Sequence, residues 1–153
     1  MSFMINLTIR SKKMKKLYSS KLKFNKDFQS LKKAFYKKKI LITGHTGFKG
    51  SWLTLWLLSF GAKVYGISKD IPTNPSHYKQ LNISKKAKGY FFEIQNKYKL
   101  QQTVKTIKPD YIFHLAAQSI VKKSFTDPVT TWNTNLVGTM SLLESLRNVN
   151  FKK

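Results

Sequence analysis

The segment ILITGHTGFKG, residues 40–50, contains the strongest structural signal in the chain. Its first four residues form a short apolar run typical of a buried strand, and its glycines recur with G-x-x-G-x-x-G spacing. Residues 51–60 are strongly apolar, which predicts a buried helix that Gly61 ends as a C-terminal cap. A strand, a glycine turn and a helix in this order are the context that a dinucleotide-binding fingerprint requires.

Each glycine of this turn has a separate physical role. Gly44 allows the tight turn, Gly47 lets a diphosphate approach the backbone, and Gly50 lets the helix pack close to the strand. A diphosphate would then lie against free N–H groups at the helix start, where the helix dipole favours negative charge. The turn therefore predicts dinucleotide binding, and the alternative is a tight turn that binds nothing.

Apolar runs and helical periodicities alternate along the rest of the chain. We expect strands at residues 62–68, 89–94 and 111–115, a loop with at most a short helix at 71–84, and helices at 98–107 and 128–149. This alternation predicts an α/β fold, an incomplete Rossmann-like, doubly wound parallel sheet of about four strands with helices on both faces. The side chains expected to face inward from the last helix are Leu136, Met140, Leu143 and Leu146.

Composition narrows the functional classes. The 153 residues suit about one domain, and 29 basic against 6 acidic residues give a net charge of +23. Nearly all the basic residues are lysines, whereas a nucleic-acid reader is usually richer in arginine, so we favour compositional drift and expect no specific nucleic-acid partner. Whether the lysines reflect compositional drift or a role in binding nucleic acid, a basic surface attracts phosphate-bearing ligands. The absence of cysteine and the wide spacing of three histidines predict no metal site.

Residues 1–38 form a basic extension, helical or disordered, before a domain at 39–153. Spacings of 4, 3 and 4 place Phe24, Phe28, Leu31 and Phe35 on one helix face. The extension could be an amphipathic helix on a membrane or nucleic acid, a targeting segment, or a poorly ordered extension whose end docks on the domain, which we favour. With no membrane-spanning run and no secretory signal, we expect a cytoplasmic protein.

Longer strings resemble a known family. The string TGHTGFKGSWL at residues 43–53 resembles the CDP-glucose 4,6-dehydratase family, in the extended branch of the short-chain dehydrogenase/reductase superfamily. Other branches typically have a hydrophobic residue where Lys49 stands. The resemblance covers about residues 35–148, and the further matching strings are DIPTNPS at 70–76, LAAQ at 115–118, VKKSFTDP at 121–128 and TNLVGT at 134–139.

The resemblance implies a set of residues around NAD. Asp70 would bind the adenosine ribose, since the commonest superfamily position for that acid falls on Ser68 here. Glu93 and Ile94 would contact adenine, and Asn135 would act in a proton relay or as a polar tie within the fold. Lys49 would add a charge near the diphosphate or remain solvated. The diphosphate would be lined by Gly44, Thr46, Gly47, Phe48 and Gly50, and the cofactor groove walled by Leu115, Ala116, Ala117 and Gln118.

The resemblance also implies a reaction. In the family, NAD takes hydride from C4 of CDP-glucose, water leaves across C5 and C6, and the hydride returns to C6. The family's Tyr-x-x-x-Lys pair is not recognisable here, because the single match, Tyr65 with Lys69, falls in the second expected strand. We therefore expect the NAD-binding, amino-terminal half of such an enzyme, from a split or truncated reading frame and inactive alone. A complementing C-terminal chain or a homodimer would be its partner.

Two alternatives stay open at this point. One is another extended short-chain epimerase or dehydratase acting on a different nucleotide sugar. The other is a non-catalytic basic module that binds nucleic acid or an anionic membrane through residues 1–38.

Overall fold

The computed structural model describes residues 26–147 and 149, and the chain divides into two units, residues 1–34 and 35–153. Within the first unit, residues 26–34 are helical. Of the predicted apolar face, Phe28 is half-buried and Leu31 is exposed, whereas Phe24 lies outside the described residues.

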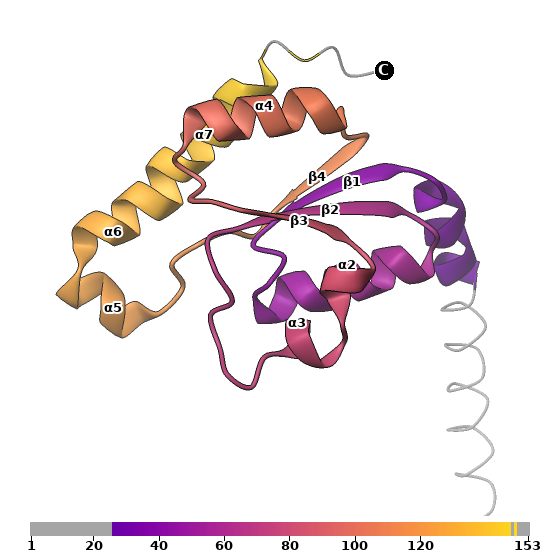
Figure 1. The fold of residues 1–153 in the computed structure, drawn as a ribbon, viewed down its shortest axis with the longest axis horizontal. Helices are drawn as coiled ribbons and strands as arrows, with labels where there is room; N and C mark the ends of the chain where they lie inside the picture. Colours follow the sequence, from indigo (N-terminus) through magenta and orange to yellow (C-terminus); the bar gives the residue numbers. More distant parts are fainter. Residues whose placement is uncertain (1–25, 148, 150–153) are drawn as a thin grey trace, which may run out of the picture. The chain divides into compact units, whose positions relative to one another are not determined.

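The second unit is built on a four-stranded parallel sheet with the strand order β3-β2-β1-β4 (Figure 1). The predicted parallel sheet is confirmed. Because β4 lies on the other side of β1 from β2, the strand order reverses between β1 and β4, and the carboxyl ends of these strands are where folds of this kind bind ligands. The strands are β1 (Lys39–Thr43), β2 (Lys63–Ser68), β3 (Lys88–Phe91) and β4 (Tyr111–His114).

Helices cover both faces of the sheet (Figure 1). The helices α2 and α3 lie on one face, and α4 and α7 pack together on the other. A short α5 and a 3-10 turn, η1, complete the connections. The helical elements are α2 (Phe48–Ser59), α3 (His77–Gln80), η1 (Ile83–Lys85), α4 (Lys97–Ile107), α5 (Val121–Thr126), α6 (Pro128–Trp132), the π-helical η2 (Asn133–Val137) and α7 (Gly138–Leu146).

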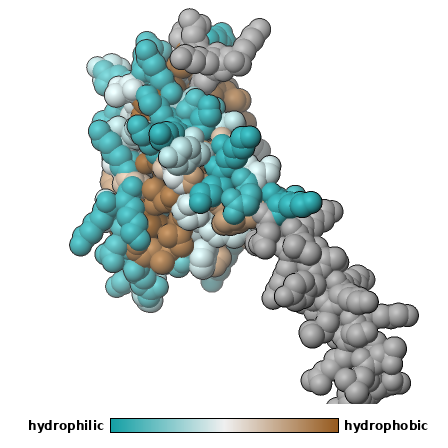
Figure 2. Space-filling view, turned by 90° about the vertical axis from the view of Figure 1, so that its right-hand side faces the viewer, coloured by the Kyte–Doolittle hydropathy of each residue, from teal (hydrophilic) through white to brown (hydrophobic). Residues whose placement is uncertain are grey.

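Figure 2 shows one face, on which hydrophilic side chains surround a smaller hydrophobic patch. Within residues 26–147 and 149, no helix is both long enough and apolar enough to cross a membrane.

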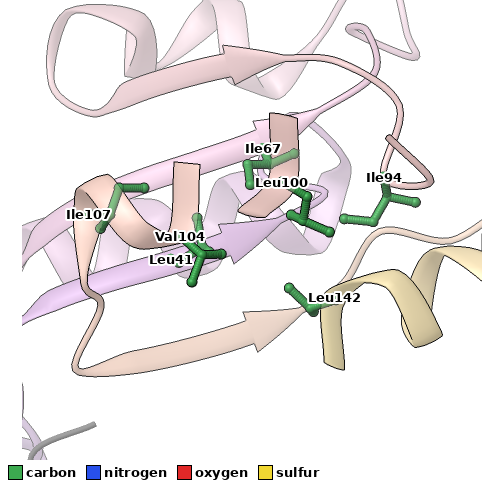
Figure 3. Packing of buried hydrophobic residues seen from close by; sticks show 7 residues of the cluster. All are labelled: Leu41, Ile67, Ile94, Leu100, Val104, Ile107 and Leu142. Atoms are coloured by element: carbon green, nitrogen blue, oxygen red, sulfur yellow. The ribbon is translucent and has the colours of Figure 1, made fainter. Parts of the chain in front are cut away.

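The main hydrophobic core lies between the sheet and the α4/α7 layer (Figure 3). As the sequence predicts for the helix at 98–107, Leu100, Val104 and Ile107 face this core and are almost fully buried. Burying such side chains stabilises the fold by about 1.5–3 kcal/mol each. The cluster consists of Leu41, Ile67, Ile94, Leu100, Val104, Ile107 and Leu142.

The prediction of a fully buried helix after the glycine turn is wrong for one face of α2. Trp52 and Trp56 are 43% and 53% exposed. The buried face is small or polar instead, because only small side chains let the helix lie close to the sheet. Gly61, with φ of +78°, ends the helix as predicted. The buried residues of α2 are Gly50, Ser51, Thr54 and Leu57.

The predicted inward face of the last helix is also wrong for three of its four residues. Leu136, Met140 and Leu143 are exposed, and Leu146 alone packs against the core cluster. The π turn η2 shifts the helical phase of the residues that follow, which a period of 3.6 does not anticipate. The residues that α7 buries are Gly138, Ser141, Leu142 and Ser145.

Phe35, the last residue of the predicted apolar face, packs within the second unit. Its ring stacks on Phe60 with centroids 6.4 Å apart and meets the edge of Tyr111 at 5.3 Å. Phe113 lies 6.3 Å from it. This aromatic cluster joins the start of the unit to β4.

Candidate functional site

The turn after β1 requires glycine at Gly44. Its φ is +76°, in the left-handed region that side chains rarely adopt. The Gly44 amide donates to the carbonyl of Ile67 at 2.7 Å, which ties the turn to β2. A Cβ at Gly44 would lie 2.7 Å from the carbonyl of Leu115, so the loop after β4 can lie directly against the turn.

Gly50 and Gly47 play different roles. A Cβ on Gly50 would overlap the carbonyl of Gly44, so the close packing of α2 on the turn depends on Gly50. A Cβ on Gly47 would contact only the Gly44 oxygen, at 3.4 Å, and otherwise point into open space. The predicted roles of Gly44 and Gly50 in backbone packing are confirmed. The approach of a diphosphate at Gly47 stays a prediction.

The start of α2 presents unpaired backbone donors. The first helical hydrogen bond runs from the Ser51 amide to the Gly47 carbonyl at 2.9 Å, so the amides of Phe48, Lys49 and Gly50 precede the hydrogen-bond ladder. Gly47, at the N-cap, has no capping side chain, and the first turn contains no acid. Lys49 is exposed beside these amides. The arrangement suits an anion.

The carboxyl end of β2 is joined to the glycine turn by hydrogen bonds. The Thr46 hydroxyl donates to the Asp70 carbonyl at 2.6 Å. Ser68 is buried, and its Oγ lies 2.8 Å from His45 Nδ1 and accepts from the Thr46 amide at 3.3 Å. The Ser68 hydroxyl is therefore occupied in the interior, and the exposed Asp70 is the first carboxylate in the chain after β2.

His45 fills the space beneath the turn. Its side chain is 1% exposed, and a Cβ on Gly66 would overlap its ring. The ring meets Tyr78 edge-on at 5.3 Å. Burial lowers the pKa of His45 from 6.5 to about 4, against an opposing hydrogen bond with the backbone of Ile67, so the ring is neutral at pH 7. Its Nε2 has no partner among the described residues.

A chain of hydrogen bonds connects β1, β4 and the last helix. The Thr43 hydroxyl accepts from the amides of Leu115 and Ala116, both at 3.2 Å, so it donates its own proton to His114 Nδ1 at 2.6 Å. His114 Nε2 then holds the ring proton and donates to Thr139 Oγ1 at 3.0 Å. Burial lowers the pKa of His114, which agrees with this neutral ring.

The same chain ends at Asn135. The Thr139 hydroxyl donates to the Asn135 carbonyl at 2.6 Å, within the π turn. The Asn135 side chain accepts from the Gln118 amide at 2.8 Å and donates to the Gln118 carbonyl at 3.1 Å. The loop after β4 is therefore fixed at both ends, by Thr43 and by Asn135.

Most of the residues predicted for the cofactor are connected by contacts. Asp70 is hydrogen-bonded to Thr46 of the glycine turn, the turn lies against Leu115, and the loop after Leu115 leads to Gln118, which is hydrogen-bonded to Asn135. At the end next to Asp70, Lys69 and Glu93 form an ion pair. Ile94 differs, because its side chain is buried in the core and is not available to a ligand.

Sequence reasoning did not identify the supporting residues Thr43, His114 and Thr139. Thr43 and His114 each end a strand next to a loop that was predicted to bind the cofactor. A polar side chain at the carboxyl end of a buried strand is the signal that could have found them.

The parallel sheet, the strand reversal and the glycine turn define a Rossmann-like fold. A family model described as GDP-mannose 4,6 dehydratase matches residues 41–153. The chain belongs to this family of nucleotide-sugar 4,6-dehydratases.

Individual relatives agree with this assignment. The chain is 41% identical over 112 residues to a CDP-glucose 4,6-dehydratase of Salmonella typhimurium, covering 73% of this chain and 31% of the relative. It is 38% identical over 123 residues to GDP-mannose 4,6 dehydratase 2 of Caenorhabditis elegans, covering 74% and 32%. The chain thus spans about a third of the length of the curated relatives it matches.

Solved structures show the same fold. A UDP-glucose 4-epimerase of Thermus thermophilus, in complex with NAD, superposes with a TM-score of 0.65 at 30% identity, covering 72% of this chain and 34% of the epimerase. An epimerase of Methanothermobacter thermautotrophicus gives a TM-score of 0.70 at 27% identity, covering 81% and 36%.

Proposed function

We propose that this chain binds NAD, with the cofactor's diphosphate on the amides of Phe48, Lys49 and Gly50. The main support is the geometry of the glycine turn, in which Gly44 and Gly50 bring the backbone of β1 and α2 together while the surroundings of Gly47 stay open. Three unpaired amides, an absent cap and no first-turn acid suit a doubly charged diphosphate. The solved epimerase with NAD supports the choice of cofactor.

The neighbouring residues fit the rest of this cofactor. Asp70 would accept hydrogen bonds from the adenosine ribose hydroxyls, and Glu93, which pairs with Lys69, would lie toward the adenine. The small side chains of Ala116 and Ala117 leave room for the cofactor along the loop after β4. NAD, when bound, would take and return a hydride on a sugar. The chain's own residues bind it, orient it and hold the loop in place.

Asn135 fits a positioning role in this proposal. Both polar atoms of its side chain are engaged with the backbone of Gln118, which favours a tie within the fold over a proton relay. The tie would keep the loop that walls the cofactor from shifting.

The nucleotide-sugar reaction is a further part of the proposal. The string containing Lys49 and the 41% identity to a CDP-glucose 4,6-dehydratase support dehydration of CDP-glucose, and another nucleotide sugar is the alternative. The given residues contain no suitably placed Tyr-x-x-x-Lys pair, so acid–base chemistry on the sugar would need groups from outside them, for example from a complementing chain.

Isothermal titration calorimetry with NAD tests the binding proposal. The whole chain is expected to bind NAD, and Gly47→Ala is expected to weaken binding because its methyl group points where the diphosphate would approach. Lys99→Gln on α4 is a matched surface control and should leave the affinity unchanged. The absence of a heat of binding in a folded sample would reject the proposal. Turnover of CDP-glucose by this chain alone would reject the need for groups from outside it.

A further inference from the structure

An ion pair joins the two segments that follow β2 and β3, and we call this place the corner. Lys69, the residue after β2, places its Nζ 2.6 Å from Oε1 of Glu93. Ser68 and Phe91 are partners in the parallel register, so the two charged residues follow adjacent strand ends. Asp70 follows Lys69 directly, and its carbonyl is bound by Thr46 of the glycine turn. The pair therefore lies beside the end of the turn that would face an adenosine.

Charge at this corner decides which adenosine ribose fits. A carboxylate accepts hydrogen bonds from a free 2′-hydroxyl, whereas a 2′-phosphate requires an available cation. Ser68 is not available to the ribose, because its hydroxyl is buried and hydrogen-bonded to His45. The charged residues that the contacts above place here are Lys69, Asp70 and Glu93.

We propose that Glu93 determines the preference for NAD over NADP by holding Lys69 in the ion pair, an inference that rests on the proposed function. While Glu93 is charged, these three residues carry a net negative charge, and the pairing keeps the Lys69 ammonium from a 2′-phosphate. When Glu93 is neutralised, the Lys69 ammonium is free to turn toward that phosphate. Glu93 is in this way a specificity-determining residue for the coenzyme.

The two partners are exposed, with 62% and 55% of their side chains accessible, so the pair can open without unfolding the corner. The pKa of Lys69 is raised, first by its hydrogen bond to Glu93 and then by the charges of Glu93 and Asp70, so Lys69 stays charged at neutral pH in either arrangement. Lys69 can therefore change its partner at this pH, but it does not change its protonation state.

The test compares NAD and NADP affinities of the whole chain by calorimetry at low salt. Glu93→Gln keeps the side-chain length and an oxygen acceptor, so the ratio of the two affinities reports the charge alone. We expect this ratio to move toward NADP by roughly twofold to fivefold, the size expected for an exposed charge interaction. The double variant Glu93→Gln/Lys69→Met should lose the gain, and raising the salt should shrink it.

Glu144→Gln is the matched control. It breaks an ion pair with Arg147, 3.1 Å long, on α7 and should leave the ratio unchanged. An unchanged ratio in Glu93→Gln, with NAD still bound, overturns the inference and leaves the proposed function intact. A gain that survives Lys69→Met also overturns it. Failure of the unmodified chain to bind either coenzyme rejects the proposed function itself, and the inference with it.

Discussion

Asn135 binds both polar backbone atoms of Gln118, with its side-chain oxygen 2.8 Å from the amide and its side-chain nitrogen 3.1 Å from the carbonyl. The asparagine lies in a π turn of the last helix, and the glutamine lies in the loop that follows β4. One side chain thus joins the helix to the loop that would wall the cofactor.

Asn135→Ala should loosen this loop. Loss of two hydrogen bonds at an exposed site should lower the free energy of unfolding by about 1–2 kcal/mol, and NAD should bind more weakly. Asn133→Ala, in the same π turn, is the control, because no side-chain hydrogen bond of Asn133 ties it to the loop in the described part of the chain. Chemical denaturation and calorimetry measure the two effects. Equal behaviour of the two variants would contradict the tie.

Gly50→Ala should lower the stability of the chain more than Gly47→Ala does. A methyl group on Gly50 would overlap the Gly44 carbonyl, so α2 must move, which should cost about 1–3 kcal/mol of stability. A methyl group on Gly47 meets only an ordinary 3.4 Å contact, so its stability should change little. Thermal unfolding checks the pair, and a Gly47→Ala variant that is the less stable of the two would oppose this reading of the turn.

Thr43→Val should destabilise the chain more than Thr54→Val, although both residues are fully buried. Valine at position 43 leaves the Ala116 amide without its acceptor, at a cost of about 1–3 kcal/mol, whereas the Leu115 amide keeps the Thr43 carbonyl at 3.0 Å. The Thr54 hydroxyl donates only to the Gly50 carbonyl, inside its own helix. Denaturant titration of both variants measures the difference, which should disappear if Thr43 does not position the loop.

Stability should fall in mild acid because of His45. Its folded-state pKa is about 4 and its ordinary value is 6.5, so between these values the unfolded chain binds a proton that the folded chain does not. Unfolding is therefore favoured as the pH falls through 6.5, and the loss at pH 5 should be about 2 kcal/mol.

His45→Gln removes this titration and is the variant to compare. Denaturant unfolding at pH 7.5 and pH 5 should show a smaller loss in the variant than in the unmodified chain. His114, whose pKa is also lowered by burial, stays in both proteins and contributes in the same direction. Equal losses in the two proteins would mean that His45 is not buried in its neutral form.

The sheet and the glycine turn could be predicted because their signals are local. Four apolar runs separated by helical stretches specify the strands, and Gly44, Gly50 and Gly61 occupy the positions that backbone geometry requires. The burial of helix faces could not be predicted in the same way. In α2 the face with Trp52 and Trp56 is the more apolar one, yet the face with Ser51, Thr54 and Leu57 is buried.

The supporting polar contacts could not be predicted because they join distant parts of the chain. Thr43 and His114 are 71 residues apart, and no pattern in either segment specifies the other. The helical period does not indicate the π turn around Asn135 either, and the side chain of Asn135 contacts the loop after β4, 17 residues away. Candidate residues were identified from the resemblance, whereas the arrangement that joins them required the structure.

The central claim is that the backbone amides at the start of α2 hold the diphosphate of a nicotinamide coenzyme. Titration of the isotope-labelled chain with NAD, followed by amide nuclear magnetic resonance, observes these amides directly. We predict that the largest shifts occur at Gly47, Phe48, Lys49 and Gly50, with smaller ones at Asp70. Shifts confined to other parts of the folded chain, or none at saturating NAD, would contradict the claim.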